Sequence, residues 1–142
     1  NGACAAELAR SVAFWPERDA QWFEDRIWIW LHYVAARLAR GERLEALAAM
    51  SFIREHVLAP MATAAAGLPQ RGLRRFEAVV PDMADAFEGT VGDVSNAALW
   101  TGLRRTAALY RELRIARPPE RPAVAADRAV TTYIERLTAE FA

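Results

Sequence analysis

The strongest pattern along the chain is an apolar stretch in residues 22–40, in which positions 27–35 are apolar at almost every place. The stretch also carries three of the five tryptophans. A segment that is apolar around its whole circumference predicts a helix buried among neighbours on several sides. The β-branched and aromatic residues at 27–34 also favour a strand, but the stretch continues without a breaker and its length favours a helix. We therefore expect a central helix over residues 19–40.

Both ends of this stretch carry the usual signals of a helix start and stop. Asp19 can cap the first turn by accepting hydrogen bonds from its free backbone amides. Glu24 and Asp25 lie near the N-terminal end, where the helix dipole favours negative charge. Arginines in the last turn, ending with Arg40, and Gly41 just beyond are typical of a helix C-terminus. The chain should therefore reverse tightly after the central helix.

The next segment predicts a helix that returns antiparallel to the central one. Apolar residues three and four positions apart mark it over residues 42–59, and Pro60 is expected to kink or end it. A loose connector is expected at 62–71, because it contains glycine and proline. Short helices are then expected at 72–80 and at 82–90.

Helical spacing also predicts elements at the two ends of the chain. Residues 2–13 are alanine-rich and should form a short helix. Ser95 is the expected N-cap of a long helix over 96–114. A proline-rich link at 117–122 separates this helix from a terminal helix at 123–141.

These elements predict an all-α protein. We expect an up-and-down antiparallel bundle of four main helices with one or two short ones, because no alternating strand pattern occurs. The 142 residues suit a single helical domain, residues 1–142, with a core large enough to fold without a disulfide or metal. Residue 1 is Asn, so we expect a fragment or a processed product.

Composition argues against several classes of partner and against a position across a membrane. Eighteen acidic residues balance eighteen arginines, so no overall charge attracts nucleic acid or an anionic membrane. The longest apolar run covers about nine residues, far below the roughly 20 that a membrane span requires. Cys4 is the single cysteine and cannot pair within the chain, which favours the reducing cytoplasm.

Short motifs of known chemistry are missing from the sequence. There is no phosphate loop, dinucleotide fingerprint, cysteine pair or His-Glu-x-x-His motif. With His32 and His56 as the only histidines, a histidine-rich metal site is excluded, and no metal is expected in this chain. The glycine-bearing segment 89–95 follows no strand and has no lysine, so phosphate binding there is not favoured.

One face of the central helix carries a candidate substrate pocket. Asp25 and His32 are seven residues apart, nearly two turns, so they point the same way with Trp28 between them. The plain interpretation is a histidine in the core beside a packing tryptophan. The alternative is a pocket lined by Glu24, Asp25, Trp28 and His32, in which acids face a cationic or hydroxyl-bearing substrate and the indole covers it.

Two arginine-bearing segments are further candidates. Arg54 and Glu55, next to His56, are candidate substrate-binding residues, although a solvated helix face is the plainer interpretation. Three arginines cluster in residues 71–75 and could hold a phosphate bidentately. In a chain of zero net charge, ion pairs with the acids in residues 77–85 are the favoured interpretation.

Four segments carry a resemblance to a known family, namely WFEDRIWIWLHYVAARLARGERLEAL at 22–47, SFIREHVLAPM at 51–61, RGLRRFE at 71–77 and ALYRELR at 108–114. The most specific part is the pair His32 and Tyr33 followed by Arg40-Gly41-Glu42. In this order the segments resemble the C-terminal helical half of a family of small bacterial nucleotidyltransferase-domain proteins. They are similar to the C-terminal bundle of kanamycin nucleotidyltransferase.

The resemblance implies a division of labour between two domains. In such proteins an N-terminal α/β domain carries a Gly-Ser motif and an Asp-x-Asp pair that holds magnesium under a nucleoside triphosphate. The helical half shapes the acceptor pocket and can supply a glutamate as base. Neither motif occurs in these residues. The resemblance therefore implies an accessory part, inactive alone, that works with an upstream nucleotidyltransferase domain on a small-molecule acceptor, with Glu24 and Asp25 as candidate bases.

Two alternatives from other classes remain. HEPN domains resemble the same arrangement, which would imply an RNase or a toxin–antitoxin component. Their RNase members carry an arginine, four to six residues and then a histidine, as at Arg26 and His32. The two residues lie about 120° apart on one helix, however, and Ile27 replaces the usual polar residue. The other alternative is a non-catalytic bundle that forms a homodimer through its apolar surface.

Overall fold

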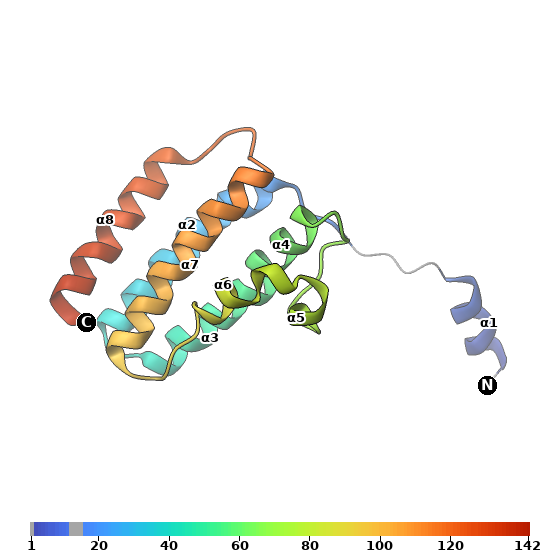
Figure 1. Cartoon of the computed structure of the whole chain (residues 1–142), viewed down its shortest axis with the longest axis horizontal. Coiled ribbons are helices and arrows are strands. Elements are labelled where there is room, and N and C mark those ends of the chain that lie inside the picture. The colour runs from blue at the N-terminus through green and yellow to red at the C-terminus, as the bar shows by residue number, and fades with distance from the viewer. Residues whose placement is uncertain (1, 12–15) are drawn as a thin grey trace.

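The computed structural model describes residues 2–11 and 16–142, and every regular element in them is helical (Figure 1). The all-α prediction is therefore confirmed. The long elements are α2 (Ala20–Ala39), α3 (Arg43–Ile53), α7 (Asn96–Ala116) and α8 (Val124–Phe141). The short ones are α1 (Gly2–Arg10), the π-helical turn η1 (Arg54–Leu58), α4 (Ala59–Ala65), α5 (Phe76–Val79), the 3-10 turn η2 (Pro81–Met83) and α6 (Ala84–Glu88).

The predicted ends of the long helices follow from local capping contacts. The Asp19 side chain accepts a hydrogen bond from Trp22 N at 2.7 Å at the start of α2. Gly41 has φ 76°, a left-handed conformation that glycine adopts without steric cost, and the chain reverses there. Ser95 Oγ accepts from Ala98 N at 3.3 Å at the start of α7. These cap predictions are confirmed.

The return helix does not end near Pro60. It widens into η1, where Ala59 N–H donates to Arg54 O, and then continues through α4 to Ala65. The wide turn lies immediately before the proline, which has no amide hydrogen to donate. Buried residues such as Met61 continue the apolar face beyond Pro60, so packing maintains the helix. The connector predicted at 62–71 is therefore wrong in its first half.

The helices do not follow the predicted up-and-down order. Arg43, the first residue of α3, donates to Val94 O just before α7, while Met61 of α4 and Leu113 near the end of α7 border the same small cavity. The segment α3–η1–α4 thus runs in the same direction as α7. Figure 1 shows the reason, because α5 and α6 carry the chain back to the starting end before α7 begins.

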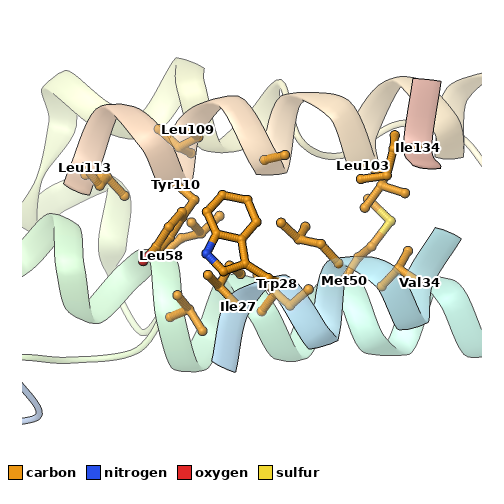
Figure 2. Packing of buried hydrophobic residues seen from close by; sticks show 14 of the residues in the cluster. Ile27, Trp28, Val34, Met50, Leu58, Leu103, Leu109, Tyr110, Leu113 and Ile134 are labelled. Atoms are coloured by element: carbon orange, nitrogen blue, oxygen red, sulfur yellow. The ribbon is translucent and has the colours of Figure 1, made fainter. Parts of the chain in front are cut away.

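The core lies where α2 meets α3, α7 and α8. Figure 2 shows Trp28 reaching from α2 toward α7, and its ring meets Tyr110 edge-on at 5.5 Å between centroids. Gly102 brings α7 close to its neighbours, because a Cβ at this position would lie 2.7 Å from Thr90 O and 3.0 Å from the Met50 methyl carbon. The core therefore depends on a close backbone approach as well as on large side chains.

The sequence predicted a central helix buried on all sides, but part of its surface is exposed. Trp28 is 3% exposed, but Ile29 is 68% exposed and Trp30 is half-buried. The helices α3, α7 and α8 pack against α2 and leave a stripe of it that includes Ile29 exposed. No helix in the described ranges is long and apolar enough to cross a membrane.

Candidate functional site

The structure places Glu24 in the interior. Its Oε1 accepts hydrogen bonds from Trp28 Nε1 at 3.2 Å, from Arg114 Nη1 at 3.0 Å and from Ala123 N at 2.8 Å. Its Oε2 accepts from the Tyr110 hydroxyl at 2.5 Å. Burial raises the pKa of Tyr110, and the hydrogen bond to Glu24 raises it further, so the hydroxyl remains a donor. Glu24 therefore ties α2 to α7 and to the start of α8.

A second acid extends this network along α7 and α8. Arg114 also donates to Asp127 Oδ2 at 3.1 Å, and Arg111 donates to Asp127 Oδ1 from Nε at 3.0 Å and from Nη2 at 2.7 Å. Two carboxylates thus alternate with two guanidinium groups. Partly buried charges that are paired in this way stabilise the contact between helices.

The pKa of Asp127 makes this network sensitive to acid. Burial alone would raise that pKa, but hydrogen bonds and charge from Arg111 and Arg114 outweigh burial and lower it. Because the folded pKa is depressed, the stabilisation is complete above the unfolded value of about 4 and is lost as pH falls through the folded value. In urea unfolding from pH 7 to pH 3, the stability gap between wild type and Asp127→Asn should therefore narrow below about pH 4.

A suitable control for this prediction is Asp25→Asn, which changes an exposed aspartate whose Oδ1, among the described residues, accepts only from Gln21 of the same helix. Its stability gap should stay small at every pH. A gap for Asp127→Asn that is the same at pH 7 and pH 3 would show that the ion pairs with the arginines do not stabilise the fold.

The four residues of the predicted substrate pocket separate into two pairs. Glu24 and Trp28 are buried, whereas Asp25 and His32 are exposed. The His32 ring stacks on Tyr133 of α8, with centroids 4.6 Å apart. The polar face that helical spacing predicted is therefore divided. Glu24 and Trp28 lie in the core, and His32 lies where α2 meets α8.

Arg54 and Glu55 also serve different neighbours. Arg54 is buried, donating to Thr90 O at 3.3 Å and to Ser51 Oγ at 3.0 Å, and burial lowers the pKa of its guanidinium. Arg54 therefore holds the backbone of the segment that follows α6. Glu55 is half-buried, and its Oε2 accepts from Leu73 N at 2.8 Å.

Glu55 and His56 open onto a pocket of about 160 Å³. Both residues belong to η1, and π-helical turns often occur at functional sites. The segment at Pro16 and Arg18, Pro60 of α4 and the loop from Gln70 to Gly72 complete its wall. We call this hollow the η1 pocket.

Specific contacts hold the wall of the η1 pocket in place. Arg18 N donates to Gln70 Oε1 at 2.9 Å, and Gln70 Nε2 donates to Arg18 O at 2.6 Å. Gln70 is 8% exposed, so this pair of hydrogen bonds is well shielded from water. A Cβ at Gly72 would lie 1.9 Å from Glu55 Oε1, so glycine lets the carboxyl group pack against the loop.

The η1 pocket is richer in cations than in acids. Arg18 and Arg71 line it together with His56, against the single carboxyl group of Glu55. The Arg18 guanidinium lies 3.8 Å from the centroid of the Trp22 ring, and within the described residues it contacts no carboxylate. Such a site can bind an anionic group and exchange hydrogen bonds with a hydroxyl.

Sequence reasoning found part of this pocket and missed the rest. Glu55 was a candidate, whereas Arg18 and Gln70 were not. These two lie 52 positions apart, and no local pattern indicates that they meet. The arginine clustered with Arg71 at position 75 takes a left-handed backbone conformation with φ 58°. Within the described residues, Arg74 and Arg75 form no salt bridge with the acids at 77–85, so the favoured ion pairs are not observed for these two arginines.

The arginine and histidine of the HEPN alternative are not brought together. Arg26 donates to Trp22 O at 3.0 Å, and its guanidinium lies 4.4 Å from the Trp22 ring centroid. His32 instead contacts Tyr133 across the seam with α8. The two side chains therefore serve different faces of α2.

The described residues contain no group of three or more His, Cys, Asp or Glu side chains placed to hold a metal ion. No family model matches the chain, and neither does any curated protein or solved structure.

Proposed function

We propose that this chain is the helical, substrate-binding part of a nucleotidyltransferase and that it holds the acceptor in the η1 pocket. The pocket itself carries the proposal. It is open, it joins two arginines to a carboxyl group and an imidazole, and its walls are fixed by Gln70 and Gly72. The segment order of the helical half supports the choice of enzyme class.

Each group in the pocket has a defined part in this proposal. Glu55 Oε2 is engaged by Leu73 N, while Oε1 accepts no hydrogen bond in the described part of the chain and is left for an acceptor hydroxyl. Arg18 and Arg71 attract the negative end of the acceptor. Gln70 is a positioning residue, because it holds the backbone of Arg18.

The chemistry of transfer is assigned to a separate α/β domain. That domain supplies the nucleoside triphosphate and magnesium sites, and the helical chain alone should transfer no nucleotide. Of the two candidate bases, Asp25 is exposed, whereas both carboxyl oxygens of Glu24 are already hydrogen-bonded.

We place the protein in the cytoplasm, in keeping with the free thiol of Cys4.

Nuclear magnetic resonance titration tests the acceptor site. The ¹⁵N-labelled chain is titrated with kanamycin, glucose 6-phosphate and adenosine monophosphate, which differ in charge and in aromatic content. At least one probe should shift the amide signals of residues 54–58 and 70–73. Glu55→Gln should weaken its binding about tenfold, a loss of about 1.4 kcal/mol.

The matched control is Glu112→Gln, which changes an exposed glutamate on α7 and should leave binding unchanged. Circular dichroism checks that both variants remain folded. If no probe shifts the η1 pocket at millimolar concentration, or if the shifts occur only along α7 and α8, the proposed acceptor site is wrong.

A further inference from the structure

A row of aromatic rings crosses the outer face of α2 and α3. The ring centroids of Trp22 and Trp30 are 6.0 Å apart, those of Trp30 and Phe52 5.2 Å, and those of Phe52 and His56 4.5 Å. The row begins on α2, crosses to α3 and ends in η1. Aromatic rings gathered on an accessible face are typical of sites that bind flat ligands.

The middle of this row borders a second hollow. Trp30, Tyr33, Ala49 and Phe52 line an open space of about 340 Å³. Phe52 is 44% exposed, so its ring is accessible from this space. We call this space the aromatic hollow.

The aromatic hollow and the η1 pocket meet at one pair of rings. Phe52 lines the aromatic hollow, and His56, four residues later, lines the η1 pocket. Their rings are in contact. A ligand that spans both spaces would therefore meet a ring surface at one end and polar groups at the other.

Positive charge lies beside both ends of the row, over Trp22 and in the η1 pocket. Arg18 and Arg26 both place their guanidinium groups over the Trp22 ring, at 3.8 Å and 4.4 Å from its centroid. Within the described residues neither contacts a carboxylate. Arg18 and Arg71 both line the η1 pocket. These two arginines suit a phosphate, because a guanidinium group can donate two hydrogen bonds to its oxygens.

Building on the function proposed above, we propose that the ligand of the η1 pocket is a phosphorylated molecule with a flat aromatic ring, the simplest example being a nucleoside monophosphate. The ring packs on Phe52 in the aromatic hollow. The phosphate lies between Arg18 and Arg71, and a hydroxyl of the ligand donates to Glu55. Charge and shape along the row thus define one orientation of the ligand.

Isothermal titration calorimetry with adenosine monophosphate, adenosine and inorganic phosphate tests this assignment. The monophosphate should bind at least tenfold more tightly than either fragment. Phe52→Ala should weaken the monophosphate about tenfold and leave inorganic phosphate unchanged. Arg18→Gln should weaken the monophosphate and inorganic phosphate but not adenosine.

Matched controls lie on α8, away from both hollows. Phe141→Ala removes another exposed phenylalanine, and Arg136→Gln removes another exposed arginine. Both should bind the monophosphate as the wild type does. Circular dichroism of all four variants shows whether a loss of binding reflects a loss of fold.

The outcomes separate the ligand class from the acceptor site itself. If glucose 6-phosphate and the monophosphate bind equally well in the η1 pocket, the proposed aromatic ligand is wrong. The proposed acceptor site would still be supported. Binding of kanamycin alone would overturn the anionic ligand but not the acceptor site. No binding of the monophosphate, together with a dimer in sedimentation equilibrium that Phe52→Ala abolishes, would show that the aromatic row joins two copies of the chain.

Discussion

Replacing Glu24 with alanine is expected to lower the free energy of unfolding by about 3–5 kcal/mol. The substitution leaves the guanidinium of Arg114, the hydroxyl of Tyr110 and the indole N–H of Trp28 without the acceptor they share. It also removes the acceptor of Ala123 N, which fixes the start of α8. Urea unfolding followed by circular dichroism at pH 7 measures the loss.

The neighbouring acid provides the control. Asp25→Ala changes an exposed residue with one hydrogen bond, to Gln21, and should alter stability by no more than about 0.5 kcal/mol. If Glu24→Ala were as stable as Asp25→Ala, the buried network would not hold α2, α7 and α8 together, and Glu24 would regain its place as a candidate base.

Trp100→Ala should be comparably destabilising, by about 3–5 kcal/mol. Trp100 is fully buried in α7, so the substitution removes its apolar contacts and leaves a cavity. Its Nε1 has no hydrogen-bond partner in the described part of the chain, so no hydrogen bond is lost with it. The expected cost therefore comes from lost packing alone. Thermal and urea unfolding both report it.

Trp30→Ala is the matched variant for this prediction. Trp30 is half-buried at the aromatic hollow, so its removal should cost clearly less stability than the removal of Trp100. If the further inference holds, Trp30→Ala should also weaken binding of adenosine monophosphate, because the Trp30 ring contacts Phe52, on which the ring of the ligand packs. Equal stability losses in the two variants would contradict the assignment of Trp100 to the core.

Helix positions could be predicted from the sequence because their signals act over a few residues. Apolar spacing located α2, α3, α7 and α8, and the side chains of Asp19 and Ser95 accept hydrogen bonds from amides three residues on. The same local logic failed at Pro60. There, burial of the following turn against the core outweighed the missing amide hydrogen.

The candidate site could be predicted only in part, because its members come together through contacts distant in sequence. Glu24 was a candidate ligand from its helix position, but three of its four donors come from residues 86 to 99 positions away, and only Trp28 is local. The η1 pocket needs Gln70 to meet Arg18 across 52 positions. No periodicity encodes such a pairing.

The sequence by itself determined that the described chain is helical and, within about two residues, where α2, α7 and α8 begin and end. Only the tertiary structure decided that α7 runs parallel to α3, that Ile29 remains outside and that Glu55 rather than Glu24 faces an open pocket. The physical reason is the range of the interactions. Capping and periodicity act within a few residues, whereas burial and hydrogen-bond partners depend on which distant helices pack against each face.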